Sequence, residues 1–137
     1  MIATTITTII CLLALGMIVY VSSYRRYDMN KWSGILAKWA DDNGVSRKKM
    51  PRYDEKTLLK ITELNLSSLG LSSLPEELGN LKNLKKLDLQ ENNLISLPEN
   101  ITALKLTHLN LRKNAALKLS EKQKAWAEKI KEFDFDD

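Results

Sequence analysis

Leucines recur along residues 61–119 at intervals that fit neither a continuous helix nor a continuous strand. The stretch "LDLQENNLISLP", residues 87–98, shows the pattern most clearly. Its first two leucines alternate with one polar residue, which places both side chains on the same face of a short strand. The later apolar residues follow at irregular intervals after Asn92. The pattern predicts a short strand, then a turn, then a return segment.

This pattern occurs three times in succession, which is typical of an internal repeat. The copies read "ITELNLSSLGLSSLPEELGNLKN" from residue 61, "LKKLDLQENNLISLPENITALK" from residue 84 and "LTHLNLRKNAALKLSEKQKAW" from residue 106. They resemble the leucine-rich repeat family, whose common pattern is LxxLxLxxNxLxxLPxxLxxLxx. The resemblance implies a short right-handed α/β solenoid of about three coils, with a parallel sheet on its concave side.

Asparagine and proline recur at fixed places within the repeat. Asn92 and Asn114 stand where the chain must turn, and we expect their side-chain amides to bond backbone groups of neighbouring coils. Pro75 and Pro98 stand where the chain runs extended and needs no backbone N–H. The copies depart from the family pattern at Leu69, Ala116 and Ser120, which replace asparagine, leucine and proline respectively.

A helix is predicted before the repeats. Its apolar stripe consists of Trp32, Ile35, Leu36 and Trp39, at positions i, i+3, i+4 and i+7. Asp28 or Asn30 is expected to cap the start of this helix, and Asn43–Gly44 to end it. The two tryptophans are expected to cover the open end of the leucine core.

A second helix is predicted after the repeats. Ser120 and Gln123 have the spacing of a capping box, in which each side chain bonds the backbone of the other residue. Trp126, Ile130 and Phe133 follow on one helical face and are expected to cover the other end of the core. The last six residues, "EFDFDD", are interpreted as an acidic tail.

The N-terminal segment is predicted to be a membrane anchor. No charged residue precedes Arg25, and a helix over residues 2–21 would be about 30 Å long, which matches the bilayer core. Arg25 and Arg26 follow directly, and the positive-inside rule then places the remaining chain in the cytoplasm. The alternative is a cleaved secretory signal and a periplasmic or secreted protein, although the segment lacks a basic N-terminal region.

These interpretations divide the chain into four parts. Residues 1–23 are the predicted transmembrane anchor, and residues 24–60 the juxtamembrane segment with the N-terminal helical cap. Residues 61–119 are the leucine-rich repeats, and residues 120–137 the C-terminal capping helix and acidic tail. The predicted fold class is thus an α/β solenoid with helical caps, preceded by one transmembrane helix.

The charge distribution favours a membrane surface over nucleic acid as a neighbour. The net charge is +4, and four of the 17 acids lie in the last six residues. Basic residues near the predicted membrane are Arg25, Arg26, Arg47, Lys48, Lys49 and Arg52, which would suit contact with anionic lipid. For Arg47, Lys48, Lys49 and Arg52, a solvated charged connector is the simpler interpretation. The remaining bases are dispersed among acids, which argues against nucleic-acid binding.

The composition argues against an enzyme. Cys11, the only cysteine, lies within the predicted anchor, and His108 is the only histidine. The rest of the chain therefore has no disulfide, cysteine nucleophile or histidine-based metal site, and it has no glycine-rich phosphate loop. We expect no catalytic activity, no cofactor and no small-molecule substrate.

The repeat frame defines a candidate binding surface. Its polar side chains on the concave sheet are Lys86, Asp88, Gln90, Glu91, His108, Asn110, Arg112 and Lys113. The resemblance implies that such a face binds a protein or peptide partner. Alternatively, the face is only solvated, mutually compensated charge, with pairs between Lys86 and Glu63 and between Lys113 and Glu91.

Overall fold

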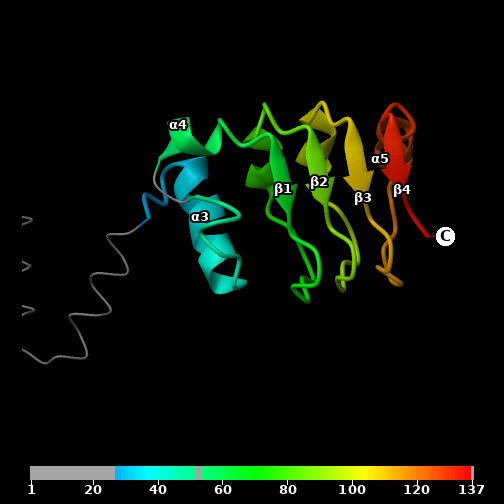
Figure 1. The fold of residues 1–137 in the computed structure, drawn as a ribbon, viewed down its shortest axis with the longest axis horizontal. Helices are drawn as coiled ribbons and strands as arrows, with labels where there is room; N and C mark the ends of the chain where they lie inside the picture. Colours follow the sequence, from blue (N-terminus) through cyan, green and yellow to red (C-terminus); the bar gives the residue numbers. More distant parts are fainter. Residues whose placement is uncertain (1–26, 52–53, 137) are drawn as a thin grey trace, which may run out of the picture.

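The computed structural model describes residues 27–51 and 54–136. Its centre is a sheet of four short parallel strands, in the order β1-β2-β3-β4. The strands are β1 Glu63–Asn65, β2 Lys86–Asp88, β3 His108–Asn110 and β4 Glu132–Asp134. They lie side by side along the long axis of the molecule (Figure 1).

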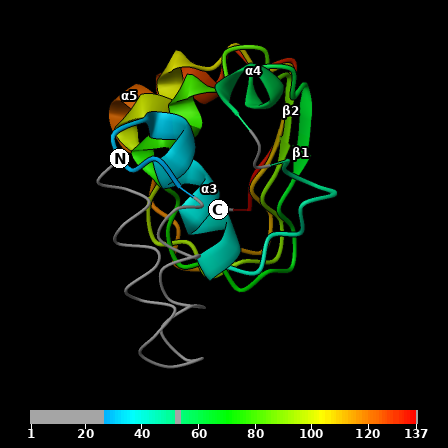
Figure 2. The ribbon, with the colours of Figure 1, turned by 90° about the vertical axis from the view of Figure 1, so that its left-hand side faces the viewer.

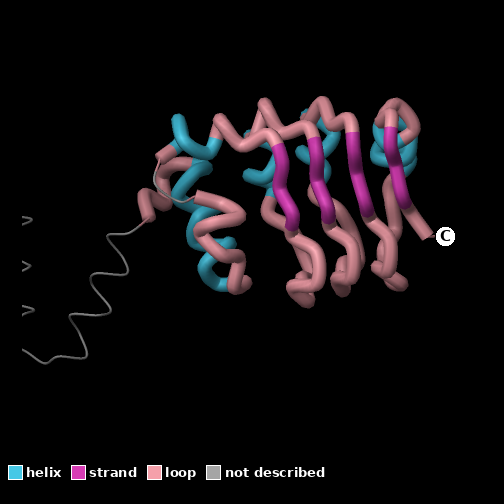
Figure 3. The backbone as a smooth tube through the Cα atoms, viewed as in Figure 1, coloured by secondary structure: helices cyan, strands magenta, loops and turns pink. Residues whose placement is uncertain are grey.

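A row of short helices forms a second layer behind the sheet. These are the 3-10 helices η1 Glu76–Asn80 and η2 Glu99–Ala103 and the α-helix α5 Glu121–Ala127. Figure 2, which looks along the row of strands, shows the helices on one side and the strands on the other. The helices α3 Trp32–Asp42 and α4 Glu55–Leu58 lie beyond β1, and loops connect the two layers (Figure 3).

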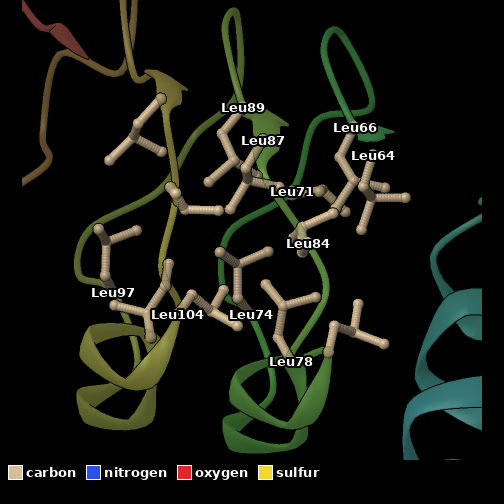
Figure 4. Close-up of a cluster of buried hydrophobic side chains, with 14 of the residues drawn as sticks. Leu64, Leu66, Leu71, Leu74, Leu78, Leu84, Leu87, Leu89, Leu97 and Leu104 are labelled. Atoms are coloured by element: carbon tan, nitrogen blue, oxygen red, sulfur yellow. The ribbon is translucent and has the colours of Figure 1, made fainter. Parts of the chain in front are cut away.

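The core between the layers consists mainly of leucine. One leucine from each of the first three strands, Leu64, Leu87 and Leu109, stands in register with the next, and Phe133 of β4 takes the fourth place. Figure 4 shows Leu64, Leu87 and other buried leucines directed into the space between sheet and helices. Each of the three strand leucines is at most 2 % exposed. Burying a leucine side chain contributes about 1.5–3 kcal/mol, so the buried leucines together supply the main favourable term in the stability of the fold.

Asn92 joins two neighbouring strand–helix units, as predicted. Its Oδ1 accepts hydrogen bonds from the backbone N–H groups of Leu69 and Leu71, at 3.1 and 3.0 Å. Its Nδ2 donates to the carbonyls of Leu66 and Leu89, both at 2.9 Å. The side chain is buried, and it satisfies backbone groups that no strand ladder reaches.

Asn114 makes the corresponding bonds one unit later. Its Nδ2 donates to the carbonyls of Leu89 and Leu111, at 3.0 and 2.9 Å. The core leucine that follows stands one position later than in the preceding unit: Leu94 comes two residues after Asn92, whereas Leu117 comes three residues after Asn114 and Ala116 is exposed.

Of the three predicted helix ends, two are confirmed and one is wrong. The capping box of α5 is confirmed: the Ser120 hydroxyl accepts from the backbone N–H of Gln123, whose side chain accepts from the Ser120 N–H. The predicted N-cap of α3 is wrong, because Lys31 holds that place and no side chain caps the helix. Gly44 ends α3 in the left-handed region, at φ 68°, as expected.

The three tryptophans pack against the ends of the core, as expected. Trp32 and Trp39 of α3, and Trp126 of α5, are partly buried against the leucine cluster. The Trp126 indole N–H also donates to the carbonyl of Leu104, at 3.0 Å. The three tryptophan rings therefore cover the ends of the core and have a structural role.

The predicted fold class, a solenoid of about three coils with helical caps and a transmembrane helix, is wrong. The structure is instead a small four-stranded parallel sheet with short helices. The C-terminal helix ends at Ala127, six residues before Phe133, and the expected acidic tail supplies β4. Residues 132–136 alternate acid and phenylalanine, which is the period of a strand and not of a helix.

The prediction of a single-pass membrane protein is corrected as well. Within residues 27–51 and 54–136, no helix is long and apolar enough to cross a membrane. The segment predicted as the anchor, residues 1–23, lies outside the described residues. The membrane localisation that rested on it is not retained.

Candidate functional site

The outer face of the sheet carries the predicted binding residues. Register places Glu63, Lys86, His108 and Glu132 in one row across the four strands, and Asn65, Asp88, Asn110 and Asp134 in the next. A groove of about 280 Å³ crosses this face and is lined by both rows together with the strand leucines. The side chains of both rows are exposed or half-buried. The sheet thus brings polar groups from four distant segments onto one open surface.

Two predicted ion pairs on this face are confirmed. Lys86 Nζ lies 2.8 Å from Glu63 Oε1, and Lys113 Nζ lies 2.6 Å from Glu91 Oε1. Both pairs join neighbouring units and are exposed to solvent, where such pairs contribute little to stability. They hold the long lysine side chains along the surface.

His108 is placed between two polar neighbours. Its Nε2 lies 2.8 Å from Glu132 Oε2, and its Nδ1 lies 2.8 Å from the Thr107 hydroxyl. Which ring nitrogen donates depends on the tautomer, and the Thr107 hydroxyl also contacts the carbonyl of Lys85 at 3.2 Å. Glu132 therefore fixes the orientation of the only histidine in the chain.

The predicted residues Asp88, Gln90 and Asn110 form one hydrogen-bonded group. The Asn110 Nδ2 donates to Gln90 Oε1 at 2.8 Å, and the backbone N–H of Gln90 donates to Asp88 Oδ1 at 3.0 Å. These contacts hold the side chains in defined positions before any ligand binds.

Asp136 engages the turn that follows β3. Its Oδ1 accepts from Arg112 Nε at 3.2 Å, and its Oδ2 accepts from the backbone N–H of Lys113 at 2.9 Å. The Lys113 N–H, more than the Arg112 charge, holds the pKa of the Asp136 carboxyl below its ordinary value. The arginine on which the predicted face relied is thus already paired.

Sequence reasoning missed the contribution of β4 to this face. Among the described residues, six carboxylates lie on or beside this face together with four permanent cations: Glu63, Asp88, Glu91, Glu132, Asp134 and Asp136, and Lys49, Lys86, Arg112 and Lys113. The face is acidic, whereas the chain as a whole carries +4. The strict alternation in "EFDFD" was the signal that could have revealed the fourth strand.

The predicted basic group does not form a single patch in the described residues. Arg47 pairs with Asp41 at 3.1 Å, and Lys49 Nζ lies 3.4 Å from Asn65 Oδ1 at the edge of the sheet. Lys48 is exposed. Arg25, Arg26 and Arg52 lie outside the described residues. The lipid contact proposed for these residues stays a prediction.

Fold and site together define a small α/β protein with a pre-organised polar sheet face. Across the described part of the chain, no group of three or more histidine, cysteine, aspartate or glutamate residues is arranged to hold a metal ion. No protein-family model, curated protein or solved structure matches the chain.

The carboxyl group of Glu91 gives a direct test of this surface. Hydrogen bonds from Lys113 first, and then from Ser68 and Gln90, lower its pKa from 4.5 to about 2. Because the folded pKa lies below the unfolded one, the stabilising contribution is complete above about pH 4.5 and is lost as the pH falls towards 2. We expect a carboxyl ¹³C NMR titration of the whole chain to show a midpoint for Glu91 near 2.

Removal of the lysine should raise that midpoint. K113M is expected to move the pKa of Glu91 towards its ordinary value, whereas K118M, which removes another exposed lysine, should leave it unchanged. An equal shift in both variants would show that general charge, and not the 2.6 Å contact, sets the pKa.

Proposed function

We propose that this chain is a non-catalytic protein-binding module whose polar sheet face receives a segment of a partner protein. The observation that carries the proposal is the open face of an all-parallel sheet. Parallel sheets occur almost only where both faces are covered by other elements. In this chain, one face is covered by helices and the other carries exposed polar side chains above a groove of about 280 Å³.

The properties of the face favour weak or multivalent binding. Tryptophan, tyrosine and arginine dominate strong protein–protein contacts, but the two central rows contain none of them, and Arg112 is held by Asp136. The ordered hydrogen bonds favour recognition of polar groups. The resemblance to leucine-rich repeat proteins, which commonly bind partners through this face, adds support.

The absence of an enzymatic role, a cofactor and a small-molecule substrate is part of the same proposal. It rests on the single histidine of the chain, whose two ring nitrogens are occupied by Thr107 and Glu132. A general base needs a nitrogen that reaches the substrate proton. The groove is also open to solvent along the sheet, whereas small-molecule sites usually enclose most of their ligand.

Site-specific photo-cross-linking in cells tests the proposal. A benzophenone amino acid at position 86, on the open face, is expected to cross-link to a distinct protein; the same probe at position 122, on α5, is not. Adding R112E should reduce the cross-link from position 86 by about tenfold, because reversal of a surface charge disrupts electrostatic complementarity. Identical products from both positions, or no effect of R112E, would remove the sheet face as the binding surface.

A further inference from the structure

The outer edge of β4 is an unpaired strand edge. β4 is the last strand in the sheet order, and within the described residues only β3 pairs with it. The Glu132 N–H donates to Thr107 O at 3.0 Å, and the Asp134 carbonyl accepts from Leu111 N at 2.7 Å. In a parallel pair, alternate residues direct their backbone groups to the same neighbour, so those of Phe133 and Phe135 point away from β3.

The side chains along this edge alternate between two chemistries. Glu132, Asp134 and Asp136 form an exposed acidic row on the sheet face. Phe133 and Phe135 form an apolar row on the core side, with ring centroids 6.1 Å apart in a stacked arrangement. Both rings are only partly buried against the core. Phe133 continues the line of strand leucines, and the next position in that line is vacant among the described residues.

We propose that the β4 edge accepts an extended segment of a partner protein in which basic and apolar residues alternate. The backbone of the segment would bond the outward N–H and C=O groups of Phe133 and Phe135, as in strand addition to other open sheets. Its apolar side chains would cover the two phenylalanine rings, and its basic side chains would face Glu132 and Asp134. This surface shares Glu132 and Asp134 with the groove on the sheet face, but its backbone groups and its phenylalanine rings lie at the edge of the sheet.

A second copy of this chain is a poor occupant of the edge. Two β4 strands paired with each other would set their acidic rows side by side. A β4 strand paired with β1 of another copy would bring Glu132 next to Glu63. Like charges directly opposite each other destabilise strand pairs, and charged edges are a common device against self-association. The charge pattern therefore selects a basic partner strand.

Binding of designed peptides to the whole 137-residue chain tests this inference. The probe is the end-blocked peptide Lys-Val-Lys-Val-Lys. One control is its acidic counterpart Glu-Val-Glu-Val-Glu, and the other is the basic peptide with methyl groups on the backbone nitrogens that would face β4. In an NMR titration of ¹⁵N-labelled protein, the basic probe is expected to shift the amide signals of Phe133 and Phe135 first. Both controls should bind at least about tenfold more weakly, because one loses charge complementarity and the other loses strand pairing.

Two charge variants test whether the basic probe binds the β4 edge specifically or is attracted by any exposed acidic residue. Asp134 has an exposed side chain on β4, and Glu128, which follows the last residue of α5, is exposed as well. D134K should weaken the basic probe about tenfold, whereas E128K, with the same change in charge, should leave its affinity within about twofold. Amide dispersion of each variant reports whether the fold is intact.

The inference fails under three results. The first is equal binding of the basic peptide and its backbone-methylated form. The second is equal weakening by D134K and E128K. The third is a shift of the Phe133 and Phe135 signals with protein concentration alone, which would identify a second copy as the occupant. None of these results bears on the cross-linking test of the sheet face, so the two proposals stand or fall separately.

Discussion

Replacing Asn92 by alanine is expected to lower the free energy of unfolding by about 4 kcal/mol, because several buried backbone groups lose their partner at once. The side chain accepts from the backbone N–H groups of Leu69 and Leu71 and donates to the carbonyl of Leu66. It also donates to the Leu89 carbonyl, which keeps the Asn114 amide as a partner. Each buried group left unsatisfied costs about 1–3 kcal/mol, and the methyl group of alanine has no donor or acceptor that could replace the amide. Urea denaturation of the whole chain, followed by circular dichroism, measures the difference.

The neighbouring residue provides a matched control. Asn93 is exposed, and its backbone N–H, not its side chain, bonds the carbonyl of Leu71. N93A should therefore change the free energy of unfolding by no more than about 0.5 kcal/mol. Similar losses in N92A and N93A would mean that the buried hydrogen bonds are not what joins the neighbouring units.

The second large effect is expected from the G79A variant, which should destabilise the protein by about 3 kcal/mol through overpacking. A Cβ atom at this position would collide with the backbone carbonyl of Asn100, where η1 contacts η2. The obstacle is main chain and not a flexible side chain, so the two helices must separate. That movement also disturbs the Glu76 carboxylate, which accepts from the backbone N–H groups of Glu99 and Asn100 at 3.2 and 2.9 Å.

The G70A variant is the control that separates this steric effect on stability from the general cost of replacing a glycine. Gly70 has φ 67°, and a Cβ there would meet nothing within 4 Å. G70A should therefore cost only the backbone strain of a left-handed alanine, about 1–2 kcal/mol. Thermal unfolding of G79A and G70A gives the comparison, and the amide signal of Asn100 should shift in G79A alone. Equal losses of stability would show that the η1–η2 contact is looser than the structure places it.

Local sequence pattern was sufficient for the parts of this protein that neighbouring residues decide. The alternating leucines identified the inward-facing residues Leu64, Leu87 and Leu109. The spacing of Ser120 and Gln123 identified the start of α5. The predicted pairs of Lys86 with Glu63 and of Lys113 with Glu91 followed from the spacing between copies, since a constant spacing keeps equivalent side chains adjacent.

The conformation of the C-terminal tail and of the loop after Asn114 depends on contacts between distant segments of the chain. "EFDFDD" has too many charges and too few residues to form a strand alone, because an isolated strand leaves its backbone groups to water. It becomes β4 only because β3 offers an open edge and Leu109 provides an apolar place beside Phe133. Likewise, Leu117 and not Ala116 is buried where the Lys118 N–H bonds the carbonyl of Ile95 in the adjacent unit.

The sequence by itself determined which strand leucines face the core, where the short helix α5 begins, and that asparagine amides join neighbouring units. Each of these depends on side-chain periodicity or on hydrogen bonds between residues at a fixed spacing. Only the tertiary structure decided that the sheet has four strands, that Glu132 orients His108, and that the open face is acidic in a basic chain. Those features arise where β4 meets β3, since pairing between residues about 24 positions apart is set by the packed core and not by local preference.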